Sequence, residues 1–246
     1  MKALDGTELK SFSGNYIHGV DLNNGYPCWN LSLSGTLHAP DFVAAIDPGV
    51  HECHRSIRET SIELIEQGHT PPGAYTPRGI WFIQAAAQIR TGAYKEWSAA
   101  SASHFSNSDA GRIAKMGAVE TAFERRRREI APEAASRLSC LYLADDDKFG
   151  RAHLRRMLGA NIHILRVNIP LAIRLTQCDT AWFDAFWNNG NLEHIDNYWN
   201  GVALGSGNPT WEYLLDGMIK ANDPEGMEFL VQNGTNIAPL PPNSIR

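Results

Sequence analysis

The stretch "NPTWEYLLDG" (residues 208–217) places a carboxylate, Glu212, at the start of a strand-like run that follows a loop rich in glycine and asparagine. Side chains in a strand alternate between its two faces. Trp211 and Tyr213 therefore share one face, while Glu212 and Leu214 share the other. Glu212 is thus predicted to lie at the mouth of a loop, where a carboxylate can face a cleft.

The composition predicts a globular protein and excludes some partners. The chain has 246 residues, 43% hydrophobic residues, a net charge of −5 and a pI of about 6.0. This balance argues against a general nucleic-acid binder or a binder of anionic membranes. The single basic run, Arg125–Arg128, lies in a helix-like segment and is interpreted as a solvated helix face. A surface for an acidic partner is the alternative interpretation.

The cysteines and the N-terminal segment indicate in which cellular compartment the protein is expected. The four cysteines, Cys28, Cys53, Cys140 and Cys178, form no paired framework, so free thiols in a reducing compartment are expected. The N-terminal segment has no apolar core typical of a Sec signal, and no apolar run reaches membrane-spanning length. The stretch "HECHR" (residues 51–55) lacks the spacing of a zinc motif, and we expect no metal.

Hydrophobic periodicity predicts an α+β fold with a helical segment in the middle of the chain. Strands are expected at residues 15–20, 29–37, 136–144, 161–169 and 211–219, and helices at residues 52–68, 80–97, 112–130, 145–159, 180–190 and 191–201. The residues from about 41 to 130 would form a helical lobe inserted into a single domain spanning residues 1–246.

Three short motifs, taken in order, resemble the mono-ADP-ribosyltransferase fold. They are "IHG" (residues 17–19), "LYLAD" (residues 141–145) and Glu212 at the head of the last strand. The resemblance is to the His-Tyr-Glu branch, and it implies two small packed β-sheets that form an NAD cleft, with one key residue on each of three strands. Residues 115–219 also resemble a family of small bacterial proteins close to the CteC-type effector family, which ADP-ribosylates ubiquitin on threonine.

The resemblance implies a role for each motif residue. Glu212 would stabilise the cation that develops on the ribose as nicotinamide leaves, and would activate the acceptor hydroxyl. Tyr142 would stack on the nicotinamide, and His18 would bind the adenosine ribose. Gly19 would let the dinucleotide approach the backbone, and Arg137 would hold the pyrophosphate.

Further candidates follow from the same resemblance. Ser139 and Trp199 are expected to contact NAD. The acceptor-recognition loop would include Gly205, Asn208, Thr210 and Trp211. Thr210 stands where arginine-modifying relatives carry glutamate and asparagine-modifying ones carry glutamine, which favours a hydroxyl acceptor.

An alternative assignment of the NAD site stays open. The segment "SRLS" (residues 136–139) is also compatible with the Arg-Ser-Glu branch of the fold, with Ser136 and Ser139 as its serines. In that case Arg137 or another arginine would take the place of His18. The His-Tyr-Glu assignment is preferred.

The expected function is that of a bacterial effector and toxin that transfers ADP-ribose from NAD to a hydroxyl acceptor. The best candidate acceptor is a threonine of host ubiquitin, whose modification would block ubiquitination. We expect a monomer that contacts neither nucleic acid nor membrane and moves from the bacterial cytoplasm into the host cytoplasm by signal-less secretion. The alternatives are an NAD glycohydrolase toxin, or a non-catalytic binding module on the same fold.

Overall fold

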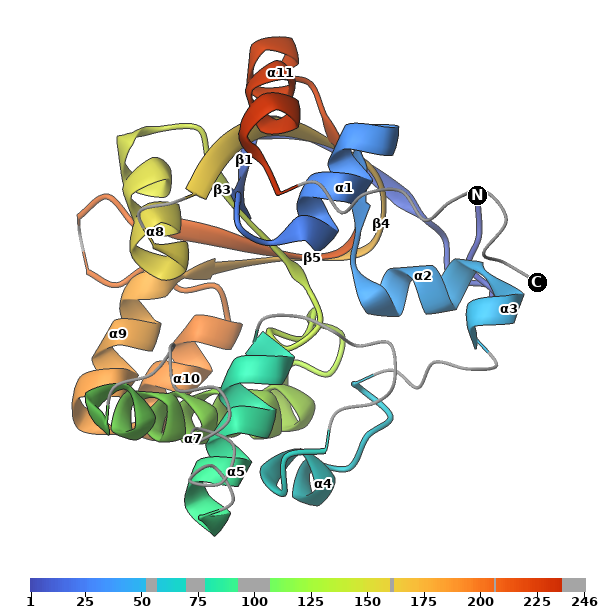
Figure 1. The fold of residues 1–246 in the computed structure, drawn as a ribbon. Helices are drawn as coiled ribbons and strands as arrows, with labels where there is room; N and C mark the ends of the chain where they lie inside the picture. The colour runs from blue at the N-terminus through green and yellow to red at the C-terminus, as the bar shows by residue number, and fades with distance from the viewer. Residues whose placement is uncertain (52–56, 70–77, 93–106, 160–161, 206, 236–246) are drawn as a thin grey trace.

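The computed structural model describes residues 1–51, 57–69, 78–92, 107–159, 162–205 and 207–235 (Figure 1). It has a mixed α/β fold. The strands are β1 (Lys10–Asp21), β2 (Thr36–His38), β3 (Leu141–Asp145), β4 (Ile162–Asp179) and β5 (Trp211–Ala221). The helices are α1 (Gly25–Ser34), α2 (Pro40–Ile46), α3 (Pro48–His51), α4 (Ile62–Glu66), the π-helical segment η1 (Arg78–Ala85), α5 (Ala86–Thr91), α7 (Asn107–Ile130), α8 (Lys148–Leu158), α9 (Thr180–Asn189), α10 (Leu192–Trp199) and α11 (Pro224–Asn233).

The described strands form one antiparallel sheet in the order β2-β5-β3-β1-β4, where two small sheets were expected. β4 is 18 residues long, and it pairs with β1 and also with β5. The four strands β5, β3, β1 and β4 therefore close into a circuit, and β2 extends it at β5. The three strands that carry the predicted motifs, β1, β3 and β5, are neighbours in this order.

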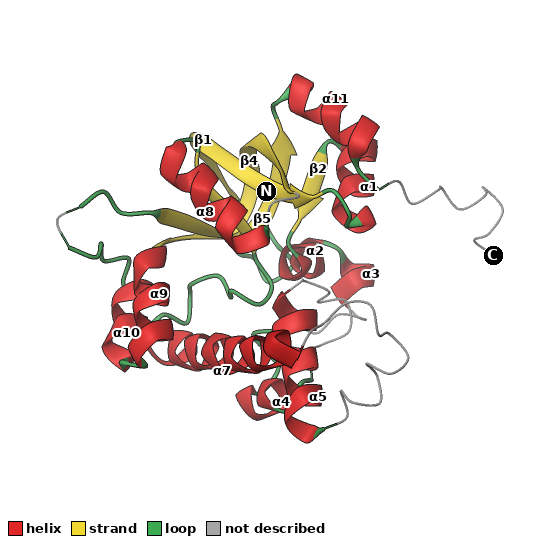
Figure 2. Cartoon of the chain, turned by 60° about the vertical axis from the view of Figure 1, so that its left-hand side comes forward, coloured by secondary structure: helices red, strands yellow, loops and turns green. Residues whose placement is uncertain are grey.

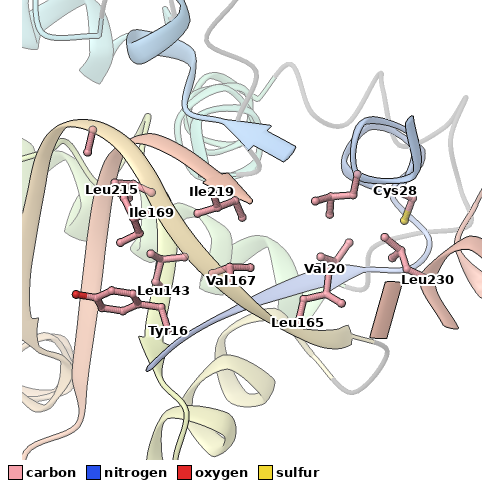
Figure 3. Close-up of a cluster of buried hydrophobic side chains, with 12 residues drawn as sticks. Tyr16, Val20, Cys28, Leu143, Leu165, Val167, Ile169, Leu215, Ile219 and Leu230 are labelled. Carbon is pink, nitrogen blue, oxygen red and sulfur yellow. The ribbon is translucent and has the colours of Figure 1, made fainter. Parts of the chain in front are cut away.

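The interior of this circuit is filled by apolar side chains (Figure 3). Alternate residues of the strands point inward, and α1 and α11 close the cluster from outside. Its fully or almost fully buried members include Val20, Leu143, Leu165, Leu215 and Leu230. Burial of this kind is the main stabilising contribution to a fold.

A helical layer covers another part of the sheet. Helices α7, α9 and α10 lie together below the sheet in Figures 1 and 2. Their cluster includes Phe123 of α7 and Tyr198 and Trp199 of α10, and it packs on Leu214 of β5. The outer face of β5 is therefore covered by helices that come from distant parts of the sequence.

Two sequence predictions about local structure are wrong. Residues 29–37 were expected as a strand, but most of them belong to α1, whose N-cap Asn24 accepts a hydrogen bond from the Tyr26 backbone and whose C-cap is Gly35 at φ 67°. The strand expected from Ser136 begins only at Leu141, because residues 136–140 form a turn in which the Cys140 N–H donates to the Ser136 carbonyl at 3.0 Å.

The basic run is not a solvated helix face. Arg127 is buried and donates two hydrogen bonds to the buried carboxylate of Glu124, at 2.8 and 3.0 Å. Arg128 binds the same carboxylate at 2.8 Å, and Arg126 binds Asp196 of α10. Successive positions of a helix point in different directions, so the arginines of the run contact different parts of the structure around α7.

Several expectations concern absence or fall on residues that are not described. Within the described segments, none of the helices is both long and apolar enough to cross a bilayer. The same segments hold no group of three or more metal-ligating side chains. Most of the "HECHR" stretch and Cys53 lie outside the described residues, whereas Cys28, Cys140 and Cys178 are buried free thiols.

A close approach between α7 and the preceding helical segment yields a testable prediction. A Cβ added to Gly117 would lie 2.2 Å from the Phe82 carbonyl oxygen and 2.4 Å from the Ala86 Cβ, whereas one added to Gly111 on the same helix would meet nothing within 4 Å. Gly117→Ala is expected to lower the free energy of unfolding by about 1–3 kcal/mol through this clash. Gly111→Ala should raise it by about 1 kcal/mol, because alanine favours helix. Urea unfolding of the two variants compares them; equal effects would contradict the close packing.

Candidate functional site

Glu212 lies at the second residue of β5, where the strand is paired on both sides. Its neighbours across the ladder are Ala144 of β3 and Cys178 of β4. Alternation along the strand directs Glu212 to the outer face, toward the helical layer that covers Leu214. The residue is only 2% exposed. A carboxylate at this position needs partners, because an unpaired buried charge is very costly.

The partners of Glu212 come from three separate parts of the chain. Glu212 Oε1 accepts hydrogen bonds from Arg137 Nη1 and from the Tyr198 hydroxyl, each at 2.6 Å. Glu212 Oε2 lies 3.5 Å from Nε2 of His153 in α8. Arg137 also binds Glu120 of α7 through two nitrogens, at 3.0 and 3.2 Å. These five residues are called the Glu212 network below.

Aromatic rings surround the cation of this network. The Arg137 Cζ atom lies 4.5 Å from the ring centroid of Phe183, 5.2 Å from that of Tyr198, 5.4 Å from that of Tyr142 and 5.5 Å from that of Phe123. A guanidinium is attracted to the negative face of such rings, most strongly where water is excluded. Arg137 is therefore held from several sides and has little freedom to move.

The network keeps Glu212 ionised. Burial alone would raise the pKa of Glu212, but the charge of Arg137 and the interactions with His153 and Tyr198 together lower it well below its ordinary value. Burial opposes the charge of Arg137, yet Glu120 and the other anionic groups hold its pKa well above the ordinary one. Two carboxylates, those of Glu120 and Glu212, share the guanidinium of Arg137.

The structure divides the predicted motif residues between two faces of the sheet. Tyr142 lies on the outer face with Glu212, because it is paired with Leu214 of β5. His18 is paired with Leu143, the residue that follows Tyr142 on β3. Because neighbouring residues of a strand point to opposite faces, His18 points to the face opposite Tyr142. The Nδ1 atom of His18 lies 2.8 Å from the backbone oxygen of Tyr142. The side chains of Tyr142 and Glu212 are brought together around Arg137, and that of His18 is not.

Three other predicted NAD contacts have clear packing partners. A Cβ on Gly19 would lie 2.7 Å from Leu158 Cδ1, so this glycine allows α8 to lie close to β1. The Ser139 hydroxyl donates to Asp41 of α2 at 2.7 Å. The Trp199 indole N–H donates to the Phe123 carbonyl at 3.0 Å. Arg137, predicted to hold a pyrophosphate, is bonded to two carboxylates instead.

The predicted acceptor loop lies at the surface next to the site. In the described part of the loop (residues 201–205 and 207–210), Gly205 (φ 73°) and Asn208 are exposed, whereas Thr210 and the following Trp211 are half-buried. The buried carboxylate of Asp179 accepts hydrogen bonds from the Leu204 N–H at 2.9 Å and the Thr210 N–H at 3.3 Å. Asp179 thus fixes the loop at two points beside the start of β5.

Neither of two described cavities is lined by Glu212, Tyr142 or His18. One, of about 480 Å³, lies among α4, α5, α7 and α10, with Arg125 and Glu129 in its wall. The other, of about 300 Å³, is lined by residues of β1, β4 and nearby loops. Because Glu212 is almost fully buried, its carboxylate is enclosed in this conformation.

Comparison with known families places this chain among proteins without an assigned role. A family model described as "Protein of unknown function (DUF2441)" matches residues 86–224, which is more than half of the chain. The chain belongs to that family. The segment shared with DUF2441 contains all five members of the Glu212 network, but not His18 or Gly19. No curated protein matches the chain.

Sequence reasoning missed three members of the network, Glu120, His153 and Tyr198. Tyr198 and Glu120 lie 61 and 17 positions from Arg137, so no local pattern connects them. A buried face could have been predicted from the apolar positions around Glu120 on its helix, where a charged residue is unusual. For His153 the sequence offers no such signal.

Proposed function

We propose that the protein is a mono-ADP-ribosyltransferase that transfers ADP-ribose from NAD to a hydroxyl group of a protein acceptor. The observation that carries the proposal is the ionised, immobilised carboxylate of Glu212 at the head of β5, which pairs with β3, the strand that carries one of the resembling motifs. Cleavage of the nicotinamide–ribose bond develops positive charge on the ribose. A fixed anion in a site that excludes water stabilises such charge without having to reorganise.

The ion pairs of the network support this assignment. Arg137 holds the carboxylate of Glu212 in place and is itself held by Glu120. A positive charge that develops beside the anion of Glu212 is stabilised by it, and the ribose cation formed as nicotinamide leaves is such a charge. Tyr142 lies on the same face as Glu212, and an aromatic ring of this kind can stack on a nicotinamide.

Substrate entry requires a change in the enclosure of Glu212. The loop before β5 extends beyond α8 in both views (Figures 1 and 2). Arg156 of α8 pairs with Asp184 of α9 at 2.9 Å, and both side chains are largely exposed. Such a pair contributes little to stability. Loss of this ion pair would therefore cost little, and movement of α8 relative to α9 is the route by which we propose that the substrate enters.

The acceptor class follows from the loop. Thr210 leaves no carboxylate or amide next to Glu212 to bind an arginine or asparagine acceptor, which favours a hydroxyl group. The exposed apolar side chains Val202 and Leu204 on the same loop favour a protein as the bearer of that hydroxyl. Ubiquitin, modified on threonine, is the first target to test because of the resemblance described above.

Two assays test this function. The protein is incubated with labelled NAD and a eukaryotic lysate, and in parallel with unlabelled NAD and ubiquitin. We expect a labelled protein band, and a gain of one ADP-ribose unit in the intact mass of ubiquitin, on threonine. Release of nicotinamide without any labelled band would identify a glycohydrolase instead. A label on other proteins but not on ubiquitin would retain the transferase and reject the target.

A second candidate function is a binding module without catalytic activity. It is favoured by the enclosure of Glu212, whose hydrogen bonds to Arg137 and Tyr198 are those of a stabilising network. Absence of both nicotinamide release and label transfer in the assays above would support this candidate.

A further inference from the structure

His153 differs from the other members of the Glu212 network because its ring is not hydrogen-bonded. The residue is 8% exposed, and neither ring nitrogen has a hydrogen-bond partner. The large majority of buried side-chain polar atoms are hydrogen-bonded, so a buried imidazole with both nitrogens unsatisfied is unusual. Its Nε2 atom points toward Glu212 at 3.5 Å from Oε2, which is close enough for attraction but too long for a good hydrogen bond.

Glu212 itself and its two hydrogen-bond donors, Arg137 and Tyr198, are poor proton acceptors. Arg137 has only donors. Burial raises the pKa of Tyr198 well above its ordinary value, and its hydroxyl already donates to Glu212. The pKa of Glu212 is lowered well below the ordinary one, and a carboxylate that binds protons so weakly is an inefficient general base. A neutral imidazole, in contrast, always has one nitrogen that accepts a proton.

We propose that His153 is the general base of the transfer reaction, and that Glu212 acts as the fixed anion beside it. This assignment rests on the proposed function. The acceptor oxygen loses its proton to a ring nitrogen of His153 and forms a bond to C1′ of the nicotinamide ribose. The bond between C1′ and the nicotinamide nitrogen breaks, and its electron pair neutralises the pyridinium. The imidazolium is stabilised by Glu212 and later releases its proton to water.

The position of His153 fits an incoming acceptor. It lies on α8, which packs on β1, β3 and β4, and its ring faces the start of β5, where the acceptor loop ends. Arg156, one turn further along α8, makes the exposed pair with Asp184. The ion pair between α8 and α9 therefore lies one helical turn from His153, the proposed base.

The test compares His153→Gln with His163→Gln. His163 of β4 is a matched control because it is half-buried, stacks on Phe229 and lies 2.9 Å from the Gly226 carbonyl oxygen, away from Glu212. Initial rates of nicotinamide release from NAD are measured with and without ubiquitin. We expect His153→Gln to lower kcat by about 10²–10⁴-fold with little change in the KM for NAD. His163→Gln should retain the wild-type kcat.

Chemical rescue separates a proton-transfer role from a structural one. Added imidazole should restore part of the rate of His153→Ala but leave the rate of Glu212→Ala unchanged. The unfolding midpoint of His153→Gln should stay close to that of the wild type, since no hydrogen bond is lost. An active wild type with an unchanged kcat in His153→Gln would overturn this assignment alone, as would a loss of activity that imidazole never restores. A wild type that releases no nicotinamide would overturn the proposed function and this assignment with it.

Discussion

Replacement of Glu212 by glutamine is expected to lower the rate of nicotinamide release from NAD by about 10²–10³-fold. Glutamine has nearly the same shape, and its amide oxygen can still accept the hydrogen bonds from Arg137 and Tyr198. What the variant loses is the negative charge that opposes the positive charge developing on the ribose. The rate is measured at saturating NAD, so that a change in NAD affinity does not contribute.

The control is Asp216→Asn, which makes the same chemical change on the same strand and, by alternation, on the same face. Asp216 binds Arg174 at 2.9 Å and has no contact with the Glu212 network in the described structure. Burial, with the nearby Asp41, raises its pKa to about 6, so its charge is already disfavoured. This variant should keep the wild-type rate. Equal rates for Glu212→Gln and the wild type would reject Glu212 as the catalytic anion.

The sheet was partly predictable, and the errors have identifiable causes. The start of β5 was found because apolar and polar residues alternate there and a loop precedes it. The prediction for β4 ended at Ile169, since Pro170 lacks a backbone donor. The strand passes this proline by means of an irregularity between Asn168 and Leu171, and then continues to Asp179. Accommodation of that kind depends on the neighbouring strand, which a single segment of sequence does not reveal.

Misassignment of α1 has a different cause. Its sequence alternates like a strand, but Asn24 and Gly35 cap it as a helix, and Cys28 and Leu31 bury one side against the strands. The capping residues were present in the sequence and should have been given more weight than the alternation.

Two of the five members of the Glu212 network, Glu212 and Arg137, were named as site residues from the sequence. Glu212 was identified from its position between a loop and a strand and was expected to face a cleft; in the structure it is buried beside Arg137 and lines neither of the two described cavities. The assignment of Arg137 to a pyrophosphate could not anticipate Glu120, because their pairing depends on how α7 lies across the sheet. Long-range ion pairs of this kind leave no trace in local periodicity.

Replacement of Arg137 by methionine is expected to lower the free energy of unfolding by about 3–5 kcal/mol. Methionine fills much of the same volume among the aromatic rings, so the loss is mainly electrostatic. Without Arg137, the carboxylates of Glu120 and Glu212 are buried without their shared cation, and burial then raises the pKa of Glu212. The variant should therefore also lose NAD cleavage. Urea unfolding and nicotinamide release measure the two effects.

The loss of stability and the loss of NAD cleavage can be separated, because only the loss of stability is due to buried carboxylates without a cation. In the double variant Arg137→Met with Glu120→Gln, one of the two buried carboxylates is removed, so part of the lost stability should return while NAD cleavage stays low. As a control, Arg125→Met removes an arginine whose partner Glu66 is equally exposed, and it should cost roughly 0–1 kcal/mol. If Arg137→Met were no more destabilising than Arg125→Met, Arg137 would not hold the carboxylates in place. Another group would then have to stabilise the ionised form of Glu212.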